Sequence, residues 1–116
     1  MNAEQIKHTE DRLHALREEL LLQKEQAAEE VAPVELDQAR LGRLSRMDAM
    51  QQQAMALELD RRRDVQLKRI EGAFLRLEKG TYGECARCNE RIDEKRMDND
   101  PTVFFCIACA RQVEKR

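Results

Sequence analysis

Two C-x-x-C pairs near the end of the chain limit its possible folds more than any other feature. The first pair is Cys85 and Cys88, the second is Cys106 and Cys109, and the 116-residue sequence contains no other cysteine. Each short pair directs two sulfurs toward one point, and the seventeen residues between the pairs form a loop that can bring them together. The spacing therefore predicts a four-cysteine metal site.

Four thiolates complete the tetrahedral shell of a Zn²⁺ ion and leave no position for a water molecule, so the predicted zinc is structural. Iron fits the same sulfur cage, and the spacing alone leaves the choice between the two metals open. Two disulfides would need an oxidising compartment, but the charged N-terminal residues lack the apolar core of a signal peptide. A redox C-x-x-C pair is expected in a βαβ context, which this sequence does not show.

The composition favours long solvated helices over a thick globular core. Charged residues make up 38% of the chain and aromatic residues 3%, a mixture typical of helices with a narrow apolar seam. The net charge of −2 argues against a general nucleic-acid binder, so we expect no direct sequence-specific DNA binding. No apolar run approaches the roughly 20 residues that span a bilayer. With reduced cysteines, we expect a cytoplasmic protein without a membrane partner.

Hydrophobic periodicity predicts two long helices. The first carries a heptad seam with two polar interruptions, made of Ile6, Thr9, Leu13, Leu16, Leu20, Gln23 and Ala27. Pro33 disfavours helical geometry just before it, so this helix should end near Glu30. The second should run from 47 to about 79 with two apolar runs, displaced from each other by one position: Met47, Met50, Ala54 and Leu57, then Leu67, Ile70, Phe74 and Leu77. Gly80 is suited to end it.

These elements predict a mainly α fold. An antiparallel helical coiled-coil hairpin covers residues 1–79 with its tip around 31–49, because each amphipathic helix needs a partner to bury its stripe. A small four-cysteine zinc finger and a short C-terminal helix follow at 80–116. Residues 34–47 form either a short helix or a structured tip. Val103, Phe104 and Phe105 have strand character, and we expect them to form a small core beneath the metal. No motif points to an enzyme.

Residues 68–112 resemble the TraR/DksA family of bacterial C4-type zinc-finger regulators. The resemblance rests on residues 68–71, 80–85 and 101–102 and on the cysteine pairs with their loop length. It implies a transcription regulator that docks on RNA polymerase and inserts the coiled-coil tip through the secondary channel. By the same resemblance, Asp48 and Ala49 lie nearest the tip. The residues that would face the polymerase rim are Arg61, Arg62, Arg63, Lys68 and Arg69.

Two positions differ from the family pattern. The tip has one acid, Asp48, where well-characterised members carry an acidic-x-x-acidic-x-Ala signature. Asp100 replaces a basic residue associated with binding of guanosine tetraphosphate, although Arg69 keeps a basic group at another position linked to that site. The resemblance therefore implies polymerase binding with at most a weak dependence on guanosine tetraphosphate.

Two other functions remain to be weighed against this one. A structural zinc-finger adaptor could use the hairpin to bind another helical partner or itself, and the five methionines suit such a surface. A DNA-binding zinc ribbon is disfavoured, because residues 80–116 carry seven acids against seven bases. Co-purification with polymerase, self-association and salt-dependent DNA retention distinguish the three.

Overall fold

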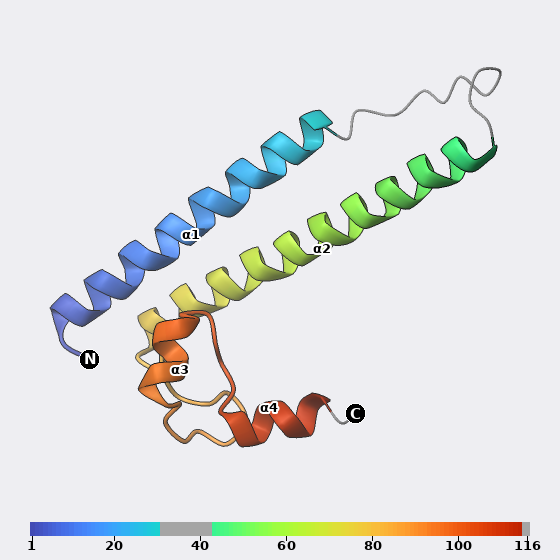
Figure 1. Cartoon of the computed structure of the whole chain (residues 1–116). Coiled ribbons are helices and arrows are strands. Elements are labelled where there is room, and N and C mark those ends of the chain that lie inside the picture. Colours follow the sequence, from blue (N-terminus) through green and yellow to red (C-terminus); the bar gives the residue numbers. More distant parts are fainter. Residues whose placement is uncertain (31–42, 115–116) are drawn as a thin grey trace. The chain divides into compact units, whose positions relative to one another are not determined.

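The computed structural model of the chain describes residues 1–30 and 43–114, and its described part contains four α-helices (Figure 1). They are α1 (Ala3–Glu30), α2 (Arg43–Lys79), α3 (Glu94–Asn99) and α4 (Ile107–Glu114). The described residues form no strand, and one isolated β-bridge joins Glu84 and Arg91. The predicted mainly α class is confirmed.

The described spans of the long helices include the segments predicted to be helical. Helix α1 is described as far as Glu30, and Pro33, which was predicted to end this helix, lies outside the described residues. Helix α2 is described from Arg43, so it includes the four residues before the predicted start at 47, and it ends at Lys79 as expected. The remainder of the predicted tip, residues 31–42, lies outside the described residues. None of the helices that the structure describes is long and apolar enough to cross a membrane.

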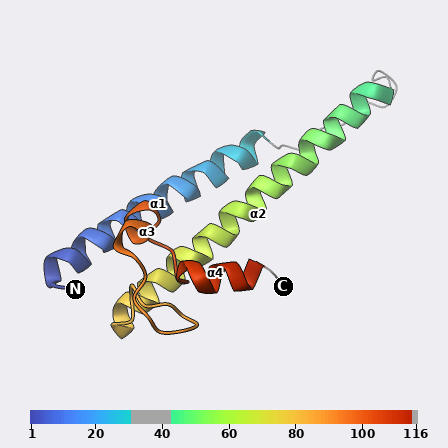
Figure 2. The same cartoon turned by 60° about the horizontal axis from the view of Figure 1, so that its bottom comes forward.

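The chain packs as two compact units. Unit 1 consists of Met1–Arg17 and Leu67–Arg116, and unit 2 of Glu18–Gln66. Each unit holds one segment of α1 and one of α2, which run side by side in opposite directions (Figures 1 and 2). The division into a hairpin at 1–79 and a finger at 80–116 stays a prediction about independent folding, because unit 1 packs the finger together with the helix segments beside it.

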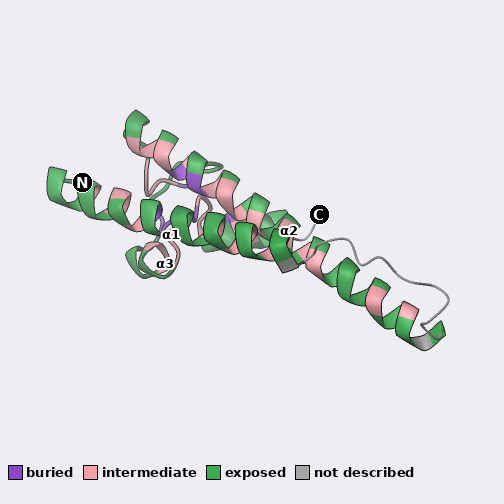
Figure 3. Ribbon diagram, turned by 90° about the horizontal axis from the view of Figure 1, so that it is seen from above, coloured by how far each residue is buried: buried purple, intermediate pink, exposed green. Residues whose placement is uncertain are grey.

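The helix pair of unit 1 is held by an apolar core. Leu13 of α1 and Ile70 and Ala73 of α2 are each 0% exposed. Figure 3 colours the buried parts of the ribbon purple. Beside them the ring of His14 lies 4.7 Å from the ring of Phe74, centroid to centroid. Burying an aliphatic side chain of this size stabilises by about 1.5–3 kcal/mol. The predicted antiparallel hairpin is therefore confirmed in this unit, with its apolar seam at the expected positions.

A glycine cap ends α2 and turns the chain into the finger. Gly80 adopts a left-handed φ of 74°, and its N–H donates to the carbonyl of Leu77 at 3.3 Å. The N–H of Thr81 donates to the carbonyl of Arg76 at 2.9 Å. These two bonds form the Schellman motif, which needs a left-handed residue just after the helix and so favours glycine there.

The helix pair of unit 2 is held by charge. Lys24 of α1 donates a hydrogen bond to Asp64 of α2, and its Nζ lies 3.6 Å from Oδ1 of Asp60. The hydrogen bond to Asp64 raises the pKa of Lys24 above its ordinary value, partial burial opposes this, and the charge of Asp60 adds to the rise. No apolar residue of this unit is fully buried among those described. The two helices are therefore bridged here by an ammonium group between two carboxylates.

The predicted seam of α2 between 47 and 57 is wrong. Met47, Met50 and Leu57 expose more than half of their surface, and Ala54 is exposed as well. The heptad pattern of the second apolar run can be extended from Leu67 toward the N-terminus in steps of four and three residues. It then reaches positions 63, 60 and 56, whose side chains are half-buried. Because α2 is one continuous helix, it keeps a single register, and that register places Ala56, Asp60 and Arg63 in the seam.

Candidate metal centre

The first cysteine pair lies in a tight turn of the backbone. The N–H of Cys85 donates to the carbonyl of Glu90 at 2.7 Å, and the N–H of Asn89 donates to the carbonyl of Cys85 at 2.9 Å. Asn89 adopts a φ of 64°, a left-handed conformation that asparagine tolerates better than most residues. Gly83 supplies a second left-handed position, with a φ of 86°, where the chain enters the turn. These bonds bring Cys85 and Cys88 toward one point.

The second pair lies at the start of α4. The N–H of Ala110 donates to the carbonyl of Cys106 at 2.9 Å, so Cys106 and Cys109 belong to one helical turn. The N–H of Ala86 donates to the carbonyl of Phe104 at 2.8 Å and ties the two cysteine turns together. The short C-terminal helix is confirmed and begins at Ile107, inside the second pair, as predicted.

The four sulfurs meet in one cluster. All of them lie within 4.8 Å of one another, and the sulfurs of Cys88 and Cys106 are 3.8 Å apart. A tetrahedral zinc ion with Zn–S bonds of about 2.3 Å holds its sulfurs about 3.8 Å apart. The cysteines are free thiols, and a disulfide would need about 2.05 Å. The cluster therefore fits a structural Zn²⁺ and does not support the two-disulfide alternative.

The thiols of the cluster differ in pKa because they lie close together in different surroundings. Burial raises the pKa of Cys85, but backbone N–H groups of Cys88, Cys106 and Arg87 outweigh it and bring the pKa to about 6. Contact with the Cys106 thiol, followed by burial, raises the pKa of Cys109 to about 12. A divalent cation at the centre favours the thiolate form of every ligand, because its positive charge offsets the repulsion between the neighbouring thiolates.

A small core lies beneath the sulfurs. Ile92 and Val103 are buried together with Cys85 and Cys109, and Met97 and Phe105 pack against them. The expected core at 103–105 is thus confirmed for Val103 and Phe105. The strand character of residues 103–105 leads to no strand in the described part of the chain, because one backbone bond, from the N–H of Ala86 to the carbonyl of Phe104, does not make a ladder, and the N–H of Val103 turns back to the carbonyl of Asp100 at 3.2 Å.

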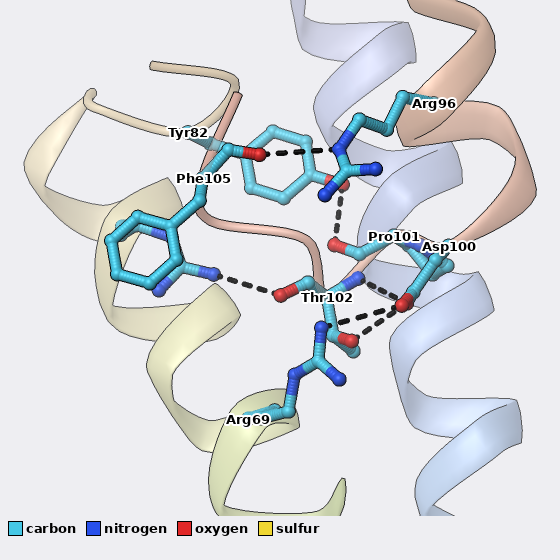
Figure 4. Close-up of polar contacts among 8 residues, drawn as sticks. Arg69, Tyr82, Arg96, Asp100, Pro101, Thr102 and Phe105 are labelled. Atoms are coloured by element: carbon cyan, nitrogen blue, oxygen red, sulfur yellow. Dashed lines mark hydrogen bonds and ion pairs between the residues drawn. The ribbon is translucent and has the colours of Figure 1, made fainter. Parts of the chain in front are cut away.

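An aspartate-centred network joins the finger to α2 (Figure 4). Oδ1 of Asp100 accepts hydrogen bonds from the N–H and the hydroxyl of Thr102, at 3.0 and 2.6 Å, and Thr102 is 0% exposed. Oδ2 of Asp100 lies 3.4 Å from a guanidinium nitrogen of Arg69, and Arg76 donates to the carbonyl of Thr102 at 3.5 Å. The turn at residues 100–102 is therefore fixed to the end of the helix pair by two arginines.

Helix α3 is the element that sequence reasoning missed. It has six residues, too few to show a hydrophobic period, and Asp93 caps its first turn by accepting from the N–H of Lys95 at 3.4 Å. The pair Asp93 and Glu94 is the N-terminal signal that could have found it. Arg96 of α3 donates to the carbonyl of Phe105 at 3.2 Å, so this helix braces the segment that leads to the second cysteine pair (Figure 4).

Two further contacts fasten unit 1. The hydroxyl of Tyr82 donates to the carbonyl of Pro101 at 2.8 Å (Figure 4). A guanidinium nitrogen of Arg12 on α1 donates to the carbonyl of Asp98 at 2.8 Å. Together with the arginines of α2, these bonds attach the finger to both long helices.

Phe104 packs against charge. The guanidinium carbons of Arg69 and Arg76 lie 5.6 and 5.5 Å from the centre of its ring, within the range of cation–π contacts. Burial lowers the pKa of Arg76; Tyr82 opposes this shift, and the nearby charge of Arg69 adds a smaller lowering. Nε of Arg69 is buried without a hydrogen-bond partner in the described part of the chain. Phe104 is therefore a platform for two arginines.

The structure divides the predicted partner-binding residues between the two units. In unit 2, Asp48 is exposed and Ala49 half-buried in the second turn of α2. Further along the same helix, Arg61 and Arg62 are exposed and Arg63 is half-buried; in unit 1, Lys68 is exposed and Arg69 half-buried. The candidate tip residues thus belong to unit 2, and the candidate rim residues are divided between the two units.

Comparison with known proteins agrees with this architecture. The helix pair and the four-sulfur cluster define a helical protein with a C4-type structural zinc finger. The model of the prokaryotic dksA/traR C4-type zinc finger matches residues 80–115. The chain is also 33% identical over 119 aligned residues to the RNA polymerase-binding transcription factor DksA of Haemophilus influenzae, covering 100% of this chain and 79% of that protein. The chain therefore belongs to the DksA family, whose members named here are transcription factors.

Two further similarities extend the comparison. The structure of transcription factor DksA2 from Pseudomonas aeruginosa matches with a TM-score of 0.77 and 29% identity, covering 100% of this chain and 88% of that one. An uncharacterized protein of Aquifex aeolicus is 45% identical over 49 residues, which is 42% of this chain and 34% of that protein. The match to the Aquifex aeolicus protein thus spans about a third of the length of that protein.

Proposed function

We propose that this chain binds RNA polymerase as a DksA-type regulator and inserts the end of its α1–α2 pair into the secondary channel. The observation that carries the proposal is the extent of the similarity. It covers the whole chain, helix pair and finger together, and the relative is named as a polymerase-binding transcription factor. A regulator of this kind works in the cytoplasm and performs no chemistry of its own.

In this proposal zinc has a structural role. Cys85, Cys88, Cys106 and Cys109 hold Zn²⁺ in a closed shell, which leaves no coordination site for a substrate. The metal orders the finger loops around Ile92 and Val103, and the finger is fastened to the helices through Arg12, Arg69 and Arg76. The finger would therefore act as the base from which the helix pair is presented to polymerase.

Asp48 is the acid proposed to act at the tip. It lies five residues after Arg43, the first described residue of α2, and its side chain is exposed. Ala49 follows it. Neither residue is required to complete a buried core, so both are available to a partner.

Arginines of α2 and Lys68 are proposed to face the polymerase rim, but three of the arginines are already engaged: Arg69 with Asp100, and Arg61 and Arg62 with Glu58. Glu58 accepts hydrogen bonds from Arg61 at 2.9 and 2.7 Å and from Arg62 at 3.3 Å. Contacts made by Arg61 and Arg62 with polymerase would have to compete with this carboxylate. Lys68 and the half-buried Arg63 and Arg69 complete the proposed set.

We further propose that guanosine tetraphosphate has little effect on this protein. Arg69 is paired with Asp100, whose carboxylate is held in place by Thr102. A phosphate group would have to approach that carboxylate and displace it from Arg69, and like charges repel at this distance. Titration of the nucleotide in a transcription assay tests the idea, and strong potentiation of the wild-type protein would contradict it.

The test of the main proposal is transcription from a ribosomal-type promoter with the Asp48→Asn variant. This substitution removes the charge and keeps the size of the side chain. We expect Asp48→Asn to bind core polymerase like the wild type and to lose the effect on transcript yield. Glu78→Gln, which changes an exposed acid near the other end of α2, is the matched control and should behave like the wild type. A wild-type protein that does not bind polymerase would contradict the proposal and favour the adaptor function.

A further inference from the structure

Helix α2 carries an exposed apolar stripe in unit 2. Met47, Met50 and Leu57 expose 57%, 63% and 61% of their surface, and Ala54 between them is also exposed. Their spacing of four and three residues is the a/d spacing with which one helix packs against another. We call these four residues the methionine stripe. It lies outside the seam that α2 forms through Ala56 and Asp60.

An arginine stands at each end of the methionine stripe. Arg43 lies four residues before Met47, and Arg61 lies four residues after Leu57, so both share the face of the stripe. Both are exposed. Glu58 partly neutralises Arg61, but it divides its hydrogen bonds between Arg61 and Arg62, so one carboxylate serves two guanidinium groups. The stripe is therefore apolar in its centre and positively charged at both ends.

These charges oppose pairing between two copies of the chain through this stripe. Antiparallel pairing that sets Met47 against Leu57 also sets Arg43 against Arg61 of the second copy. Parallel pairing sets each arginine against its own equivalent. Like charges placed opposite each other on paired helices are destabilising and disfavour that partner. The stripe is complementary to a helix with acidic residues at both ends.

We propose that the methionine stripe is a docking surface for an acidic amphipathic helix of a partner protein. Aliphatic side chains of that helix pack on Met47, Met50 and Leu57, and carboxylates near its two ends pair with Arg43 and Arg61. Methionine suits this role because its flexible, polarisable side chain adapts to different aliphatic partners. The proposal rests on α2 alone and does not depend on polymerase binding.

The test uses a synthetic helical peptide of about 21 residues, long enough to lie along the whole stripe. Leucines occupy its a and d positions and glutamates flank them; a second peptide carries lysines in place of the glutamates. Each is titrated by fluorescence anisotropy against the full zinc-loaded chain. We expect the glutamate peptide to bind at least about tenfold more tightly than the lysine peptide. Equal binding of the two peptides would overturn the proposal.

Two matched pairs of variants locate the binding surface. Met50→Glu places a charge in the stripe, whereas Met55→Glu changes a methionine of similar exposure, 61%, about 140° around the helix. We expect Met50→Glu to weaken the glutamate peptide at least about tenfold and Met55→Glu to leave its affinity within about twofold. Leu57→Glu and Leu59→Glu form the second pair, in case one variant folds poorly. An equal loss in both members of a pair would refute the assignment.

Sedimentation of the chain without peptide tests the alternative that a second copy of the chain binds the methionine stripe. We expect a monomer at the concentrations used for the titration. A dimer that Met50→Glu dissociates and Met55→Glu does not would overturn the proposal in favour of a second copy. Neither result bears on the transcription assay with Asp48→Asn, so the two proposals fail independently.

Discussion

Replacing Leu13 with alanine tests the packing on which unit 1 depends. Leu13 is 0% exposed, so Leu13→Ala removes three carbon groups from a buried position. At about 0.8 kcal/mol per buried CH₂, the lost transfer free energy is about 2.4 kcal/mol. The cavity left behind adds to this, and buried Leu→Ala changes span about 2–5 kcal/mol. We expect a loss of about 3 kcal/mol in the free energy of unfolding, because two helices can partly close over the gap.

Leu22→Ala is the matched control on the same helix. Leu22 exposes 54% of its surface, so the same substitution should change stability by less than about 0.5 kcal/mol. Urea and thermal unfolding followed by helical circular dichroism, with zinc present, measure both variants. We expect Leu13→Ala to lower the Tm by more than about 10 °C. Equal effects of the two substitutions, or a loss below about 1 kcal/mol for Leu13→Ala, would refute the assigned core.

Two further predictions concern the finger and the charged part of α2. Cys88→Ser should abolish zinc retention and loosen the finger, yet keep most of the helical circular dichroism, because the core at Leu13, Ile70 and Ala73 contains no finger residue; full loss of the helical signal would show one folding unit. Hydrogen bonds from Arg61, opposed by partial burial and helped by Arg62, lower the pKa of Glu58 to about 2. A lowered folded-state pKa means that the stabilising pair is present above the unfolded pKa of about 4.5 and is lost as the pH falls toward 2. An NMR titration in which Glu58 ionises near 4.5 would contradict this.

Features set by the conformational needs of single residues could be predicted from the sequence. Gly80 was predicted to end α2, and it does so with a left-handed φ of 74°. The cysteine spacing predicted a cluster that the structure forms, because two short turns and a loop constrain the sulfurs whatever the surrounding packing.

The seam of α2 could not be predicted in the same way. Apolar periodicity identified Met47, Met50 and Leu57 as core, but these residues are exposed and Asp60 is in the seam instead. Hydrophobicity marks a surface that fits an apolar neighbour, and it does not say which helix supplies that neighbour. The ion pairs of Lys24 could not be predicted from local sequence patterns, because Asp60 and Asp64 lie about 40 residues away from Lys24 in the sequence.

The network around Asp100 illustrates the same limit within the finger. The sequence did not predict that Asp100 binds Arg69 and Thr102, because these contacts depend on how the finger packs against α2. Helix α3 was missed because six residues carry no periodic signal. Local geometry was thus predictable, whereas contacts between distant segments were not.

The central claim is that the end of α2 that carries Asp48 enters the secondary channel of RNA polymerase. Its most direct test is a photo-crosslinking residue placed at position 48, with position 78 near the other end of α2 as the comparison, in a complex with core polymerase. The account predicts cross-links from position 48 to catalytic subunit segments that line the channel, and none to those segments from position 78. Cross-links to the channel from position 78, or none from position 48 in a complex that forms, would contradict it.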